Sequence, residues 1–202
     1  LTKKGLKIHE FELLGTAEVD YKPVYVLGFD QQEGLKKAGY RGKMYIDAET
    51  FGFVHFDFEL SPRGIGYFKY GDAATRMLLN VIGLDITMEK DHYQISYQKI
   101  GEKYYLSNVA NDARLRFHSA RENYDFTADA RVDYLVTHLQ TVDVKPFSEA
   151  DVLKSRKLIE QQHSSYDPDF WKAHTIILPG RDFVWIAMDI AEKNSAWKLK
   201  SK

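Results

Sequence analysis

Cysteine is absent from this chain of 202 residues, which excludes disulfide bonds, cysteine-ligated zinc and thiol catalysis. No apolar run reaches about 18 residues, so we expect no transmembrane segment. The charges nearly cancel, with 28 basic and 29 acidic side chains. Because binding to phosphate backbones needs a basic excess or a basic stripe, we expect no nucleic-acid partner. The chain opens at Leu1 without a signal peptide, as expected of a mature or trimmed form.

Motifs for cofactors and catalysis are missing as well. The pair Gly64 and Gly66 lacks the downstream residues of a phosphate-binding loop. Neither the nucleophile elbow of hydrolases nor the His-Glu-x-x-His zinc motif occurs. The sequence therefore predicts no cofactor, no metal site and no catalytic residue.

Aromatic residues, in contrast, are abundant, with 13 Tyr, 12 Phe and 3 Trp, and they favour strands. The clearest β-hairpin lies between Tyr40 and Leu60, with a turn at Asp47–Thr50. Its returning strand alternates apolar and polar residues, which is typical of a half-buried strand. Strands are predicted over residues 21–29, 40–46, 51–60, 93–98, 104–109, 115–117, 124–128 and 132–142.

Helical patterns are fewer and lie mainly near the C-terminus. Asp72 is a candidate N-cap for a short helix that runs toward Gly83. After a capping-box pattern at Ser148, residues 149–163 are rich in helix formers, and residues 182–193 have one apolar face.

The spacing of these segments predicts a mainly β (α+β) fold, namely a curved antiparallel sheet or half-open barrel covered by C-terminal helices. We predict one domain over residues 1–202, with a β-rich body at about 18–145 and a helical part at about 148–193.

The polar positions of the returning strand form the first candidate site. His55, Asp57 and Glu59 alternate along one face, where they offer metal ligands or an acid–base pair. Alternate side chains on a strand are roughly 6.5–7 Å apart, which is wide for one small ion. The solvated face of a hairpin is therefore the favoured interpretation.

A basic cluster is the second candidate. Arg114, Arg116 and His118 alternate along another predicted strand and suggest an anion-binding site. The alternative is an exposed strand face on which neighbouring acids such as Asp125 and Asp129 balance the charge.

The apolar face of the sheet is the third and strongest candidate. Aromatic side chains on this face would line a cavity for a hydrophobic ligand if the sheet and helices enclose one. The alternative is a filled core. The candidate ligand-binding residues are Phe56, Phe58, Tyr93, Tyr97, Phe117 and Phe126.

Several short runs resemble a known family. They are Pro23–Phe29, Tyr40–Phe53, Tyr93–Lys99 and Asp169–Trp171. Together they resemble the β-rich module of envelope proteins that carry a carboxypeptidase-regulatory-like domain. That module is similar to the lipoprotein-carrier fold of the LolA and LolB type, and it implies a periplasmic or outer-membrane-associated location.

The first functional hypothesis is thus a non-enzymatic envelope module that binds a lipid, an acyl chain or an envelope protein partner in a cleft between sheet and helices. A structural or interaction domain with a filled core is the second. A hydrolase that uses His55, Asp57 and Glu59 is the third. The sequence leaves the oligomeric state open.

Overall fold

The computed structural model describes residues 3–149, 152, 154, 169 and 172. Contacts divide the chain into two units, Leu1–Val136 and Thr137–Lys202, and the first unit contains the sheet. The helices predicted at 149–163 and 182–193 fall almost entirely outside the described residues. The single domain over residues 1–202 stays a prediction.

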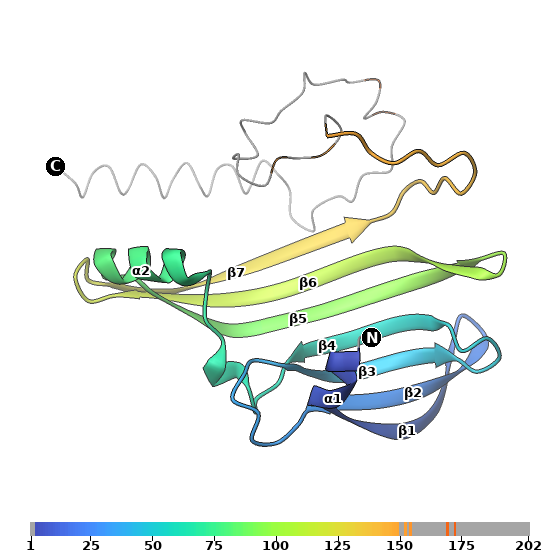
Figure 1. The fold of residues 1–202 in the computed structure, drawn as a ribbon, viewed down its shortest axis with the longest axis horizontal. Helices are drawn as coiled ribbons and strands as arrows, with labels where there is room; N and C mark the ends of the chain where they lie inside the picture. Colours follow the sequence, from blue (N-terminus) through green and yellow to red (C-terminus); the bar gives the residue numbers. More distant parts are fainter. Residues whose placement is uncertain (1–2, 150–151, 153, 155–168, 170–171, 173–202) are drawn as a thin grey trace. The chain divides into compact units, whose positions relative to one another are not determined.

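The first unit is a seven-stranded antiparallel sheet in which each strand pairs with the next one along the chain (Figure 1). The sheet is open, because β1 and β7 each pair on one side alone. The predicted mainly β, antiparallel fold is thus confirmed. The strands are β1 (His9–Val19), β2 (Lys22–Gln31), β3 (Tyr40–Asp47), β4 (Phe53–Leu60), β5 (Asp85–Ile100), β6 (Lys103–Ser119) and β7 (Tyr124–Leu135).

The hairpin predicted between Tyr40 and Leu60 is formed by β3 and β4. The strands predicted at residues 93–98 and 104–109 lie within β5 and β6, which form a second hairpin that turns at Gly101. Gly101 has a positive φ of 62°, a conformation that glycine adopts without steric cost. Both strands extend far beyond the predicted segments, and residues 115–117 are the continuation of β6.

Two strand predictions need correction. The strand β1 was not expected, because a bulge between Leu13 and Gly15 interrupts its alternation of polar and apolar residues. The strand predicted at residues 132–142 is confirmed over residues 132–135, which are the end of β7, and is wrong beyond them, because no strand is described over residues 136–149. The pairing of β7 with β6 ends at Leu135 and Asn108. The neighbouring residue on β6, Ser107, lies at a register shift and has no register partner in β5.

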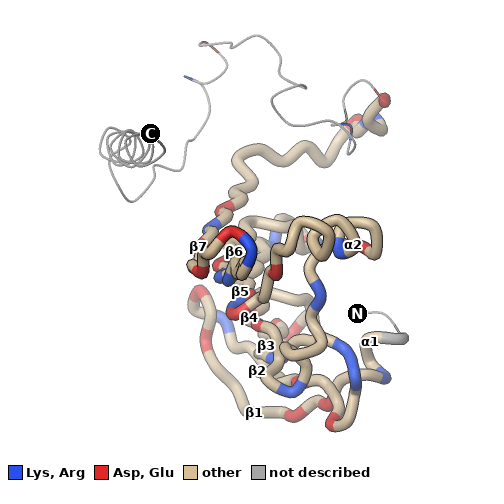
Figure 2. The backbone as a smooth tube through the Cα atoms, turned by 90° about the vertical axis from the view of Figure 1, so that its left-hand side faces the viewer, with Lys and Arg blue, Asp and Glu red and all other residues tan. Residues whose placement is uncertain are grey.

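Three short helical segments accompany the sheet: α1 (Lys3–Ile8), the 3-10 helix η1 (Ile65–Tyr67) and α2 (Ala73–Ile82). The predicted cap of α2 is confirmed, since the Asp72 side chain accepts a hydrogen bond from the Thr75 amide at 2.7 Å. Gly83 ends the helix with a φ of 71°. Figure 2 shows α1 and α2 on the same side of the sheet. No helix in the described part of the chain combines the length and apolar character needed to cross a membrane.

The pleat of the strands gives the sheet two chemically different faces. One cross-strand row, with one residue from each strand, is entirely apolar and defines what we call the apolar face. The adjacent row is largely charged or polar and defines the polar face. The apolar row is Leu13, Leu27, Met44, Phe56, Ile95, Val109 and Tyr134, and the polar row is Glu12, Gly28, Lys43, Asp57, Gln94, Ala110 and Asp133.

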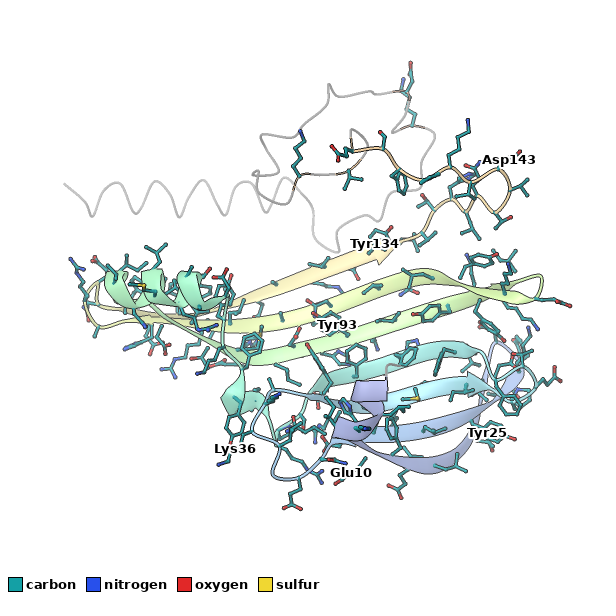
Figure 3. All side chains as sticks on the ribbon, viewed as in Figure 1. Glu10, Tyr25, Lys36, Tyr93, Tyr134 and Asp143 are labelled. Carbon is teal, nitrogen blue, oxygen red and sulfur yellow. The ribbon has the colours of Figure 1, made fainter. Side chains whose placement is uncertain are left out.

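Little of the apolar face is fully covered. Among the described residues, Met44 and Leu60 are the buried apolar side chains of this face. Leu13 and Tyr134, at the two ends of the apolar row, are 64% and 59% exposed. Figure 3 shows Tyr93 and Tyr134 on their strands. The apolar face therefore offers open hydrophobic surface as well as core.

Candidate functional site

A hollow of about 310 Å³ lies on the apolar face, and its walls come from α1 and the first five strands. Its lining is almost wholly aromatic and aliphatic. The lining residues are Gly5, His9, Phe11, Phe29, Tyr40, Met44, Phe56, Phe58, Ile95 and Tyr97.

Aromatic contacts fix the walls of the hollow. Phe58 stacks on Tyr93 with ring centroids 5.3 Å apart, and Tyr40 meets Phe58 edge-on at 5.3 Å. Phe29 and Phe58 lie 6.4 Å apart across Gly42, which is the register partner of both. A Cβ at Gly42 would overlap the Phe58 backbone. Glycine at this position therefore allows the close approach of β3 to β4.

The six aromatic residues predicted for this face do not form one site. Phe56, Phe58 and Tyr97 line the hollow. Tyr93 stacks on Phe58 but is not itself a lining residue. Phe117 and Phe126 instead stack on each other 5.2 Å apart, on β6 and β7, and do not line it.

Other lining residues were not predicted as site residues. His9 and Phe11 come from the unexpected strand β1, and Phe29 and Met44 come from β2 and β3. The alternation of Tyr25, Leu27 and Phe29 did predict a strand at the position of β2. Nothing in the sequence indicated which strands would contribute to one hollow.

One carboxylate interrupts the apolar face beside the hollow. Asp91 is 6% exposed and precedes Tyr93 and Ile95 in the same alternation along β5. The Tyr40 hydroxyl donates to its Oδ2 at 3.2 Å, and the Asn111 amide donates to its Oδ1 at 2.8 Å. Burial raises the pKa of Tyr40 to about 12, and the nearby Asp91 charge adds to that rise.

A wider trough of about 770 Å³ lies on the polar face. Ion pairs occupy much of its lining. Arg41 Nη2 lies 2.7 Å from Glu59 Oε1, and Arg63 Nη1 lies 3.0 Å from Glu10 Oε2. Figure 2 shows acidic and basic residues on neighbouring strands. Exposed pairs of this kind typically stabilise a fold by less than about 1 kcal/mol each.

The three residues proposed as a polar site engage different neighbours. His55 Nδ1 lies 2.9 Å from Ser96 Oγ, and burial lowers the pKa of His55. Burial acts to raise the pKa of Asp57, but hydrogen bonds from His92 and Gln94 outweigh it, so the pKa lies below its ordinary value.

Glu59, the third residue of this row, accepts two hydrogen bonds from Arg41. No group of three or more His, Asp or Glu side chains suited to hold a metal occurs in the part of the chain that the structure describes. The structure therefore does not bring His55, Asp57 and Glu59 together around one centre.

The residues proposed for anion binding are paired with acids. Arg114 makes two hydrogen bonds to Asp129, at 2.7 and 3.0 Å, and Arg116 binds both carboxylate oxygens of Asp125. His118 Nδ1 lies 3.7 Å from Asp125. An incoming anion would have to compete with these carboxylates.

Comparisons of the chain with models of known families, with curated proteins and with solved structures find no match. The resemblance to envelope proteins with a carboxypeptidase-regulatory-like domain stays a prediction that rests on the short runs quoted above.

Proposed function

We propose that this chain is a non-enzymatic binding module that takes an apolar ligand, such as a lipid or acyl chain, into the hollow on its apolar face. The observation that carries the proposal is the hollow itself, with its aromatic and aliphatic lining. Ligand sites commonly span about 300–1,000 Å³. At about 310 Å³ this one suits a single alkyl chain better than a two-chain lipid.

The driving force would be hydrophobic. Each methylene group that leaves water for such a lining contributes roughly 0.8 kcal/mol. Phe11, which forms part of the wall, is 37% exposed, so a ligand would also cover protein surface that now faces water. A periplasmic or outer-membrane-associated location belongs to the proposal as well, and its support is the family resemblance alone.

A neutral apolar dye, diphenylhexatriene, and its displacement by decanol provide the test. Ile95 lines the hollow, so we expect Ile95→Trp to fill part of it and to weaken dye and decanol binding by about tenfold or more. Leu13→Trp is the matched control, because Leu13 lies in the same apolar row without lining the hollow. Equal binding by both variants, or no binding by the unchanged protein, would contradict the proposal.

The alternative of an interaction domain is favoured by a different observation. On α2, the apolar side chains Met77 and Val81 are 71% and 67% exposed, one turn apart. Exposed apolar stripes of this kind are common where proteins dock. A protein that binds neither the dye nor decanol would leave this alternative as the better account of the chain.

A further inference from the structure

A buried negative charge lies next to an apolar hollow in this protein. The Asp91 side chain is 6% exposed, and its hydrogen-bond partners, Tyr40, Tyr93 and Asn111, are neutral. Across the described side chains, no Lys, Arg or His nitrogen forms an ion pair with it. Because buried charges are normally paired, the local field of Asp91 favours a positive group nearby.

Tyr40 connects this carboxylate to the hollow, since it both lines the hollow and donates its hydroxyl proton to Asp91. With that proton engaged, the Tyr40 oxygen has only lone pairs to offer to another partner. A ligand group that meets this oxygen must therefore donate a hydrogen bond. A carboxylate or phosphate, which accepts hydrogen bonds alone, would find no donor there and would face the Asp91 charge.

The aromatic rings around Tyr40 favour the same ligand chemistry. Tyr40 lies edge-on to Phe58 and to Tyr93, and Phe58 stacks on Tyr93. Two of these three rings, Tyr40 and Tyr93, hydrogen-bond to the carboxylate. The faces of such rings carry partial negative charge and attract ammonium groups. Ring faces, a lone-pair oxygen and a buried carboxylate all favour a cation.

We infer that the hollow selects single-chain amphiphiles whose polar end is an amine, with the alkyl chain in the hollow and the ammonium group toward Tyr40 and Asp91. This inference rests on the proposed function, because it names the class of ligand for the same hollow. It also narrows that function, since fatty acids and other anionic amphiphiles become poor ligands.

The test compares three probes with the same alkyl chain: decylamine, decanol and decanoate, each near neutral pH and below its micelle-forming concentration. We expect decylamine to displace diphenylhexatriene at a concentration about tenfold lower than decanoate does, the effect of one charge-assisted contact. Asp91→Asn keeps the shape of the side chain and removes its charge. In that variant the preference for the amine should fall to within about twofold.

Two further variants complete the experiment. Asp129→Asn removes a carboxylate from the polar face and should leave the preference for the amine unchanged, because Asp129 pairs with Arg114 away from the hollow. Tyr40→Phe removes the hydroxyl but keeps the ring, and it should reduce the preference. If Asp91→Asn does not fold, as judged by circular dichroism, Tyr40→Phe carries the test.

The outcomes separate the inference from the function on which it rests. Equal or tighter binding of decanoate, or an unchanged preference in the Asp91→Asn and Tyr40→Phe variants, would overturn the inference while decanol binding still supported the hollow. Failure of all three probes to bind would overturn the proposed function itself.

Discussion

The carboxylate of Asp47, at the end of β3, accepts three hydrogen bonds. The Tyr104 hydroxyl on β6 donates to its Oδ2 at 2.6 Å, while the backbone amides of Glu49 and Thr50 donate to its Oδ1 at 2.9 Å each. Asp47 is a buried residue, with 5% of its surface exposed. These bonds, led by that from Tyr104, hold the pKa of Asp47 far below its ordinary value. The ionised carboxylate thus fastens the β3–β4 turn to β6.

This contact predicts a pH-dependent stability. Because the folded pKa of Asp47 is depressed, its stabilising effect is complete above the ordinary carboxyl pKa of about 4 and is lost as the pH falls through the folded value. We expect Asp47→Asn to lower the free energy of unfolding by about 1.5–3 kcal/mol at neutral pH. The difference should shrink below about pH 4, as measured by urea denaturation. Glu49→Gln, on the same turn and exposed, is the control and should change stability by less than about 0.5 kcal/mol.

At the residue scale, the sequence predicted which side chains share a face but not which ones touch. Alternation along β4 placed Phe56 and Phe58 on the apolar face and Asp57 opposite them, as the register shows. The bond between Asp47 and Tyr104 joins residues 57 positions apart. No local pattern encodes such a contact, because it depends on how far β6 extends past the β3–β4 turn.

At the scale of elements, the packing of β3 against β4 depends on glycine, which has no side chain, at position 42. Gly42 lies between Phe29 and Phe58 in the register, and a methyl group there would meet the Asp57 carbonyl and the Phe58 backbone. We expect Gly42→Ala to destabilise the fold by about 1–3 kcal/mol, the usual cost of overpacking. Gly66→Ala is the matched control, since nothing lies within 4 Å of a Cβ at that position. Equal melting temperatures for the two variants would contradict this account of the β2–β4 packing.

The elements that the sequence predicted well are those with strong local signals. The β3–β4 hairpin has a polar turn between two alternating strands, and α2 has Asp72 at its start and Gly83 at its end. The strand β1 was missed because its bulge at Gly15 shifts the alternation partway along. The end of β7 was misplaced because Val136 and Val142 continue a strand-like pattern beyond Leu135, where the register with β6 ends.

The whole molecule is best understood from the contrast between its two sheet faces. The polar face carries several ion pairs, such as Arg41–Glu59 and Arg114–Asp129. The apolar face has few fully buried side chains in the described residues and contains the hollow beside Asp91. Single-sequence patterns predicted this division between faces. They did not reveal whether the apolar face is filled or hollow, since Phe56 and Phe58 would show the same alternation in either case.

The central claim is that the hollow binds the apolar part of a ligand, and nuclear Overhauser contacts between decanol and the protein test it most directly. Met44 and Ile95 line the hollow, so their methyl groups should show contacts to the alkyl chain of decanol. The exposed methyl groups of Met77 and Val81 on α2 serve as the comparison and should show none. Contacts confined to α2, or spread evenly over all exposed apolar side chains, would contradict the account.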